Sequence, residues 1–270
     1  MNTTSIQQRK EAILAKAYQN GQVVATRLAE ELGISDATVR RDLRALAEAG
    51  LLELNHGGAQ LRKNLDYSFI SKSMRNVEAK RRIAQIAAGL IEGGQQVFLD
   101  SGTTCFHIAG YLRGKKNISV IVNSVRTAQE LHTPDLHVLM LGGQYRADRM
   151  DSVGPITAET LAKIRGYRAF IGCDGAGMDF GPSSIDIDSA HIFSMAIRNA
   201  RESILLADYS KFESPALFKI ANWNSISMVI TEKPPPAKWT RFFEQNQIQI
   251  LYPENPNLNV ITETQLNRNE

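Results

Sequence analysis

The sequence predicts an α/β protein with a small, mainly helical N-terminal domain and a larger domain that holds a parallel sheet. The first sixty residues show helical spacing of apolar side chains, with no strong strand signal before Leu51. From Gln95 onward, short apolar runs alternate with amphipathic stretches, which is typical of a largely parallel sheet covered by helices. Residues 62–77 are polar and lack a sustained apolar period. We therefore predict domains over 1–61 and 78–270, joined by a linker over 62–77.

Three helices are expected in the N-terminal domain. The second stops at Gly33, because glycine commonly ends a helix. Ser35 is a suitable N-cap for the third helix, since its hydroxyl can accept a bond from an unpaired backbone N–H of the first turn. This third helix is expected to run to about Ala49 and to end at Gly50. The apolar residues at helical spacing are Ile6, Ile13 and Leu14 in the first helix and Val24, Leu28 and Leu32 in the second.

The third helix has an apolar face, formed by Val39, Leu43 and Leu46, and an opposite polar face. Two short helices, a glycine-containing turn and a third helix with small, hydroxyl and arginine side chains are typical of a helix-turn-helix, whose second helix fits the major groove of DNA. The alternative is that the arginines only make the helix soluble. The candidate DNA contacts, which include a histidine of the following segment, are Ser35, Ala37, Thr38, Arg40, Arg41, Arg44 and His56.

Residues 51–61 alternate loosely around Gly57-Gly58, which predicts a short hairpin and hence the wing of a winged helix-turn-helix. His56 stands beside these glycines. It can contact a DNA phosphate or simply complete the turn, and the pattern slightly favours the turn.

Seven strands are predicted in the larger domain, after a first helix over 78–91. In such sheets ligands bind beyond the carboxyl ends of the strands, so these ends are the expected place for a binding site. The predicted strands cover residues 96–100, 118–123, 136–141, 168–173, 203–207, 227–231 and 248–252.

Small and polar residues follow five of these strands. The turn at 100–104 directly precedes a helix, and a helix N-terminus offers free N–H groups and a positive dipole end to an anion. The ammonium of Lys211 would add to a phosphate site, while Asp174 and Asn123 suit sugar hydroxyls. The alternatives are a plain N-cap for the turn and tight connections for the glycine pair 142–143. The candidate contacts to a phosphorylated sugar or sugar acid are Ser101, Gly102, Thr103, Thr104, Asn123, Ser124, Gly142, Gly143, Asp174 and Lys211.

Composition bears on compartment and cofactors. With 43% hydrophobic and 22% charged residues, the chain has the composition of an ordinary soluble protein. Its net charge of +3 is too small to indicate a nucleic-acid partner by itself. Cys105 and Cys173 lie far apart without metal-ligand neighbours, so we expect a reducing compartment, no metal and no cofactor. Neither a leader segment nor an apolar stretch of about 18 residues is present, so we expect a cytoplasmic protein without a membrane partner.

Several short motifs occur in a specific order along the chain. They are Ala37-Thr38-Val39-Arg40-Arg41-Asp42-Leu43, His56-Gly57-Gly58-Ala59, Leu99-Asp100-Ser101-Gly102-Thr103-Thr104, Val122-Asn123-Ser124, Leu141-Gly142-Gly143, Val153-Gly154-Pro155, Gly172-Cys173-Asp174-Gly175 and Ala207-Asp208-Tyr209-Ser210-Lys211-Phe212. In this order they resemble the DeoR family of bacterial regulators over nearly the whole chain. The resemblance implies a DNA-binding transcriptional repressor of carbohydrate-use genes, a homo-oligomer (dimer or tetramer), and release from DNA by a phosphorylated sugar or intermediate. It also implies a sensor domain related to ribose-phosphate isomerases.

The chain departs from the family pattern at three places. Many members carry arginines before the hairpin glycines, where this chain has Glu53, Leu54 and Asn55, so its wing is expected to hold phosphate less firmly. Farther on, Ser189 stands in place of the usual acid and Phe193 in place of the usual lysine.

A sugar-phosphate isomerase fused to a DNA-binding module is the alternative function. Related isomerases carry two aspartates in a D-G-A-D turn, whereas this chain reads Asp174-Gly175-Ala176-Gly177 and so lacks the second carboxylate. We therefore predict a binding pocket with no catalytic residues and no enzymatic activity. A third possibility, a scaffold without a ligand, is disfavoured by the turn at 101–104 and by Lys211.

Overall fold

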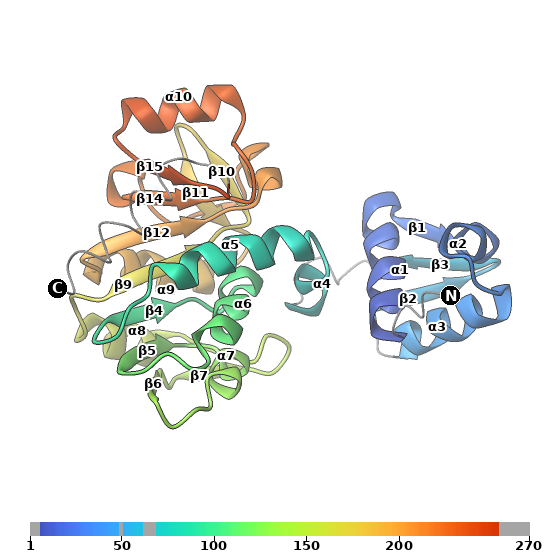
Figure 1. Cartoon of the computed structure of the whole chain (residues 1–270), viewed down its shortest axis with the longest axis horizontal. Helices are drawn as coiled ribbons and strands as arrows, with labels where there is room; N and C mark the ends of the chain where they lie inside the picture. The colour runs from blue at the N-terminus through green and yellow to red at the C-terminus, as the bar shows by residue number, and fades with distance from the viewer. Residues whose placement is uncertain (1–5, 49–50, 62–68, 254–270) are drawn as a thin grey trace. The chain divides into compact units, whose positions relative to one another are not determined.

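The computed structural model describes residues 6–48, 51–61 and 69–253 (Figure 1). The chain divides into two compact units, Met1–Val77 and Glu78–Glu270, each with its own apolar core. Within the described part, none of the helices is long and apolar enough to cross a membrane.

The first unit combines three helices with a small antiparallel sheet. In chain order its elements are α1 (Ile6–Asn20), β1 (Gln22–Val24), α2 (Ala25–Leu32), α3 (Asp36–Glu48), β2 (Leu52–Asn55) and β3 (Gly58–Leu61). The strands pair in the order β1-β3-β2. Gly33 ends α2 in the left-handed conformation, with φ 64°, as predicted. The predicted end of the third helix at Ala49 and Gly50 lies outside the described residues. The helices and the hairpin together form the predicted winged helix-turn-helix.

One strand of this unit was missed from the sequence. No strand was expected before Leu51, and Val24 was placed in the second helix; both expectations are wrong, because β1 ends at Val24, whose side chain is 44% exposed. A three-residue strand is too short to show a clear alternation. Its pairing with β3 depends on a glycine, since a Cβ on Gly58 would lie 1.9 Å from the carbonyl oxygen of Val23.

The end of the first unit departs from the expected linker over 62–77. Residues Phe69–Ser73 form the short helix α4, and Met74 packs against the apolar core of this unit. Residues 62–68 lie outside the described residues. Part of the expected linker therefore belongs to the first unit.

A seven-stranded sheet forms the centre of the second unit, and every strand pair in it is parallel. Its strands are β4 (Gln96–Leu99), β5 (Ile118–Val122), β6 (Leu136–Met140), β9 (Arg168–Gly172), β12 (Glu202–Leu206), β14 (Met228–Ile230) and β15 (Gln249–Leu251). All seven predicted strands are confirmed to within one residue at each end. The spatial order is β15-β14-β12-β9-β4-β5-β6, so the direction in which the chain adds strands reverses between β4 and β9. A reversal of this kind is where parallel sheets bind ligands.

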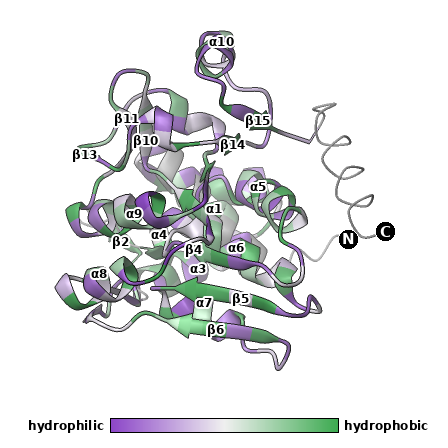
Figure 2. Cartoon of the chain, turned by 90° about the vertical axis from the view of Figure 1, so that its left-hand side faces the viewer, coloured by the Kyte–Doolittle hydropathy of each residue, from purple (hydrophilic) through white to green (hydrophobic). Residues whose placement is uncertain are grey.

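Helices cover both faces of this sheet. They are α5 (Val77–Gly89), α6 (Thr103–Leu112), α7 (Val125–Glu130), α8 (Pro155–Ala162), α9 (Ile187–Asn199) and α10 (Ala237–Gln245). Val97 and Leu99 of β4 pack in the layer that includes α5 and α6, whereas Phe98 packs in the layer with α8, α9 and α10. The strands are therefore buried on both faces, and β4 and β5 are coloured as hydrophobic in Figure 2.

Short antiparallel strands and 3-10 helices lie at the carboxyl edge of the sheet. They are β7 (Gln144–Arg146) with β8 (Asp151–Val153), β10 (Gly175–Gly177) with β11 (Gly181–Ser184) and β13 (Phe218–Lys219), and the 3-10 helices η1 (Tyr209–Phe212) and η2 (Trp223–Ser225). The sequence predicted none of them. They begin soon after β6, β9 and β12 end, so they surround the edge where the candidate ligand contacts lie.

Candidate functional site

The helix α3 presents a free polar face. Ser35 precedes it, and the Ser35 Oγ accepts a hydrogen bond from the Thr38 backbone N–H at 3.2 Å, which confirms the predicted N-cap. Ala37, Arg41 and Arg44 are exposed, whereas the apolar stripe of the same helix is buried. Neither arginine forms an ion pair with a residue that the structure describes. Two guanidinium groups are thus free to bond DNA bases.

Arg40 differs from these two arginines. Its Nε lies 2.6 Å from the Oδ2 of Asp36, one turn earlier on α3, and both side chains are exposed. Exposed pairs of this kind stabilise a helix only weakly. Arg40 is therefore paired within the helix, in contrast to Arg41 and Arg44, for which no ion pair with a described residue is found.

A buried ion pair fixes α3 against α1. Asp42 is 3% exposed, and its two oxygens accept hydrogen bonds from Arg9 Nε at 2.5 Å and Nη2 at 3.2 Å. The hydrogen bond to Asp42 raises the pKa of Arg9 further above its usual value. Sequence reasoning missed this pair. The available signal was an acid, Asp42, within the apolar stripe of a helix that is otherwise rich in arginine.

The wing is a two-residue hairpin turn at His56-Gly57. Asn55 pairs with Gly58 across it, and Gly57 has a φ of 93°, which glycine adopts without strain. The Gly57 carbonyl oxygen accepts a hydrogen bond from the Ala25 N–H at 2.9 Å, which ties the turn to α2. The His56 side chain is exposed at the tip. It completes the turn and is also open to a DNA phosphate.

In the second unit, Asp100 joins the two strands at which the sheet order reverses. This fully buried carboxylate accepts hydrogen bonds from the Gly102 N–H at 2.7 Å and from the Gly172 N–H at 2.6 Å. Burial raises the pKa of Asp100. The sequence placed Asp100 at the end of a strand without a role. In the structure it locks the turn at 101–104 to the end of β9.

That turn opens α6 without a side-chain cap. Gly102 is the N-cap residue, and as a glycine it provides no side-chain cap for the first turn of the helix. Ser101 and Thr103 are 9% and 7% exposed, and Thr104 is half-buried. A plain N-cap at Gly102 and an anion site both remain compatible with this turn. The backbone N–H groups are directed toward the carboxyl edge of the sheet, where an anion would satisfy them.

Lys211 and Asp174 come to the same edge from β12 and β9. The Cys173 thiol lies within the electrostatic influence of both groups, and burial, opposed by the charge of Lys211, raises the pKa of this thiol to about 12. The Asp174 Oδ2 accepts hydrogen bonds from the Ile185 N–H at 3.0 Å and the Ser184 Oγ at 3.2 Å. The sheet thus brings together the turn at 101–104, Asp174 and Lys211.

Lys211 stands on a firmly held segment. It lies on η1, and the Nζ of Lys211 is 3.9 Å from the Oδ2 of Asp208. The next residue, Phe212, is buried in an aromatic cluster, and its carbonyl oxygen accepts a hydrogen bond from the Trp239 indole N–H at 2.9 Å. The backbone that carries the ammonium is therefore fixed before any ligand arrives.

The remaining predicted ligand contacts are engaged mainly within the chain. The Ser124 Oγ caps α7 by accepting from the Thr127 N–H at 3.3 Å. Gly142 and Gly143 are exposed, and a Cβ on Gly143 would lie 2.0 Å from the Thr157 Oγ1, so packing explains this glycine. Asn123 is fully buried and donates to the Ser152 carbonyl oxygen at 3.0 Å, but its Oδ1 has no hydrogen-bond partner among the described residues.

Arg146 of β7, which the sequence analysis did not single out, links the hairpin of β7 and β8 to the start of α9. Arg146 makes two hydrogen bonds of 2.8 Å to Asp151 and one of 2.8 Å to Asp186, the N-cap of α9. It also donates to the Ser189 Oγ at 3.2 Å. Burial lowers the pKa of Arg146, but the hydrogen bonds to both aspartates outweigh burial and raise it. Ser189, which replaces the family's usual acid, therefore leaves Asp186 as the main partner of Arg146 on α9.

Asp186 connects this arginine to Asp174. The Asp186 N–H donates to the Ser184 Oγ at 3.1 Å, and the same hydroxyl donates to Asp174. A continuous polar chain thus runs from the end of β9 to the hairpin of β7 and β8. Phe193, in place of the family's usual lysine, is 6% exposed and belongs to the apolar core, so no cation reaches the edge from that position.

The missing second carboxylate also has a packing reason. A Cβ on Gly177 would lie 3.2 Å from the Phe180 Cβ and 3.4 Å from the Pro215 Cβ. An aspartate at Gly177 would require these neighbours to move. The packing around β10 therefore favours a glycine at this position.

Comparison with known proteins identifies both units. Residues 9–64 match the model of the DeoR-like helix-turn-helix domain, and residues 75–233 match the DeoR C terminal sensor domain. The chain is 31% identical over 253 residues to the HTH-type transcriptional repressor CsqR of Escherichia coli, covering 91% of this chain and 95% of the repressor. It is 28% identical to the glycerol-3-phosphate regulon repressor of Escherichia coli (90% and 97% covered) and 36% identical to the lactose phosphotransferase system repressor of Lactococcus lactis (76% and 82% covered).

Among solved structures, ribose 5 phosphate isomerase A from Neisseria gonorrhoeae aligns with 50% of this chain and 53% of its own, at 16% identity and a TM-score of 0.36. The relatives that match over nearly their whole length are named as transcriptional repressors or regulators, and both halves of the chain match one family. The chain belongs to the DeoR family, and it is a DNA-binding transcription regulator rather than an enzyme.

Proposed function

We propose that this chain represses genes of carbohydrate use and that a phosphorylated sugar or sugar acid controls its hold on operator DNA. In this proposal residues 1–61 bind DNA and residues 78–270 bind the effector. The names of two relatives, which refer to glycerol 3-phosphate and to a lactose phosphotransferase system, support the choice of ligand class.

The observation that carries the proposal is the meeting of three features at the reversal of strand order. The N-terminus of α6, which has no side-chain cap, lies just beyond β4, Asp174 lies at the end of β9, and Lys211 lies just beyond β12. Backbone N–H groups and an ammonium together suit a phosphate. Hydroxyls of Ser101, Thr103 and Thr104 would complete this half of the site.

Sugar hydroxyls would occupy the other half. Asp174 is oriented by two hydrogen bonds from its own chain, and in this proposal its carboxylate accepts a hydrogen bond from a ligand hydroxyl. The unpartnered Oδ1 of the buried Asn123 would accept a further hydroxyl proton. A buried acceptor without a donor is costly, so a ligand that supplies the donor gains affinity.

On the DNA side, Ala37, Thr38, Arg41 and Arg44 would enter the major groove, with Arg40 and His56 near the phosphates. One helix reads one half-site, so we propose that the chain works as a dimer or tetramer on a two-fold operator. Its place of action would be the cytoplasm, where operator DNA lies.

The test is a fluorescence-anisotropy titration of the chain on a promoter fragment, repeated with a panel of sugar phosphates and sugar-acid phosphates and their unphosphorylated forms. At least one phosphorylated compound should change the operator affinity, and its unphosphorylated form should not. A shift of about 5- to 150-fold would be an ordinary coupling between two sites. Equal effects from both forms would show that the turn at 101–104 is only a helix start.

A further inference from the structure

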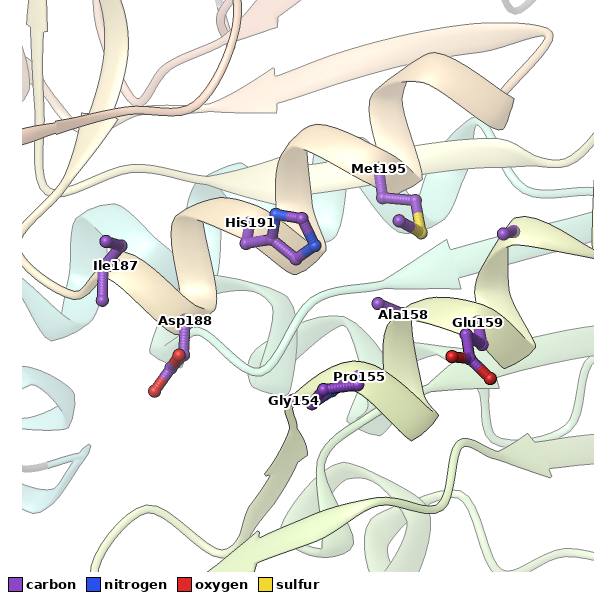
Figure 3. Close-up of a pocket in the computed structure, with 9 residues that line it drawn as sticks. Gly154, Pro155, Ala158, Glu159, Ile187, Asp188, His191 and Met195 are labelled. Atoms are coloured by element: carbon purple, nitrogen blue, oxygen red, sulfur yellow. The ribbon is translucent and has the colours of Figure 1, made fainter.

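The second unit carries an apolar groove away from the residues proposed to hold the effector. The groove has a volume of about 560 Å³ and lies between α8 and α9. Ala158 and Ala162 of α8 and Met195 of α9 are among its lining residues. Figure 3 shows the two helices side by side, running in the same direction along the groove.

Two exposed isoleucines add to this apolar surface, and one of them, Ile187, lines the groove itself. Ile156 is 65% exposed and Ile187 is 59% exposed, one at the start of each helix. The groove lining also includes the ionisable residues Glu159, Asp188 and His191. Exposed apolar side chains rimmed by polar residues are one mark of a protein interface.

Charges along the two helices are arranged asymmetrically. Asp188 lies at the N-terminal end of α9, with its side chain 54% exposed. Lys163, Arg198 and Arg201 lie at or just after the C-terminal ends of the helices and are exposed. None of these three cations forms an ion pair within the described part of the chain. One end of the surface is thus acidic and the other basic.

Two copies of this surface have complementary charges when a two-fold axis relates them. Asp188 and Arg198 are ten residues apart, or about 15 Å along a helix. Their midpoint falls between His191 and Met195, which both line the groove. A two-fold axis at that midpoint places the Asp188 of each copy opposite the Arg198 of the other, with the apolar grooves facing each other.

We propose that two copies of this chain associate through the α8–α9 surface, with α9 antiparallel to its counterpart. This inference rests on the proposed function for the existence of an oligomer and adds where the copies meet. The rim isoleucines pack into the facing groove, and the Asp188–Arg198 pairs set the register.

The experiment measures molar mass by light scattering and sedimentation on the full chain over a range of concentrations. Ile156→Glu and Ile187→Glu should each raise the dissociation constant of the oligomer at least a hundredfold, because a carboxylate would be buried at the interface. The matched control is Leu217→Glu, whose side chain is 73% exposed and does not line the groove. Circular dichroism and the melting temperature establish that each variant is folded.

A charge-reversal pair gives the sharper result. Asp188→Arg or Arg198→Asp alone should weaken association at least tenfold, because each places like charges opposite each other. Mixing the two variants should restore it as a heterodimer, since one then supplies two arginines and the other two aspartates. Asp188 also lies 3.8 Å from Arg146 of its own chain, but a defect from losing that contact would not be rescued by mixing. Arg241→Asp, on the exposed face of α10, is the charge control.

The outcomes separate the two proposals. A monomeric wild-type chain would overturn assembly itself, together with this interface, while leaving effector-controlled DNA binding to its own test. An oligomeric wild-type chain whose mass survives both isoleucine changes, or whose charge variants fail to rescue each other, would overturn the α8–α9 surface alone.

Discussion

The DNA-facing helix of the first unit and the ligand-facing edge of the second place their residues by different means. On α3, Arg41 and Arg44 are exposed because they lie opposite the stripe of Val39, Leu43 and Leu46 on one helix. At the sheet edge, the turn at 101–104 and Lys211 are more than a hundred residues apart and meet only because β4, β9 and β12 are neighbours. The helical repeat of the sequence places the residues of α3, whereas the order of strands in the sheet places the residues of the ligand-facing edge.

The two sites also differ in how much their residues are used for internal bonds. Arg41 and Arg44 of α3 form no ion pair with the described residues, whereas Asp100, Asp174 and Ser124 at the sheet edge are all held by their own chain. A helix surface can vary without loss of fold. Changes at the sheet edge affect folding and binding together, so experiments there need structural controls.

The largest expected effect concerns the ion pair that holds α3 against α1. Asp42→Ala removes both hydrogen bonds between Asp42 and Arg9, so we expect the first unit to lose about 2 to 3 kcal/mol in free energy of unfolding. Urea denaturation followed by circular dichroism measures it. Lys16→Ala is the control, because its pair with Glu31 is exposed and should contribute about 1 kcal/mol or less. Equal losses in both variants would show that the buried pair does not hold α3.

DNA affinity should distinguish the arginines of α3 from one another. Arg41→Ala and Arg44→Ala should each weaken operator binding by about 1 to 3 kcal/mol, the usual cost of a lost two-bond contact to guanine. Arg40→Ala should cost less, because Asp36 already engages its guanidinium. Titrations on operator DNA and on random DNA measure the specific and the non-specific affinity of each variant. An equal loss on the two DNAs would make Arg41 and Arg44 phosphate contacts, and wild-type affinity in both variants would contradict the role of this helix.

At the sheet edge, Lys211→Ala and Thr103→Ala should each reduce affinity for a phosphorylated effector about tenfold, or about 1.4 kcal/mol, since each removes one bond to the phosphate. Calorimetry of the full chain measures this effect. Lys219→Ala is a matched control, because this exposed lysine contacts the ring of Phe180 and is not among the proposed ligand contacts. The assignment fails if the control loses as much affinity as the Lys211 variant.

The smallest effect concerns the chain of polar contacts behind the ligand edge. Burial acts to raise the pKa of Asp186, but hydrogen bonds from Ser189 and Arg146 outweigh it, so the pKa is lowered on folding. The ionised group therefore stabilises the second unit above its unfolded pKa of about 3.9, and the stabilisation is lost as pH falls through the folded value.

Melting temperatures between pH 6 and pH 3 test this point. Asp186→Asn should melt lower than the wild type at pH 6 and should lose less on acidification. Asp179→Asn, an exposed aspartate on the same unit, should follow the wild-type curve. Parallel curves for the wild type and the Asp186 variant would show that Asp186 adds no stability through its charge.

The sequence by itself determined the elements that express a local pattern. The seven sheet strands, the cap at Ser35 and the two faces of α3 follow from the spacing of apolar residues and from the chemistry of single side chains, and the structure confirms each of them. The candidate ligand edge was also accessible, because a parallel sheet brings all strand ends to one side.

Only the tertiary structure decided which of those strand ends could act together. The Oδ1 of Asn123 has no hydrogen-bond partner among the described residues, whereas Ser124 caps a helix and Gly143 is required by the close approach of Thr157. The sequence pattern alone did not distinguish these three residues as ligand contacts. The buried pairs of Arg9 with Asp42 and of Arg146 with Asp151 also join residues from different elements. Contacts of that kind have no sequence period, because they depend on how elements pack and not on how residues repeat within one element.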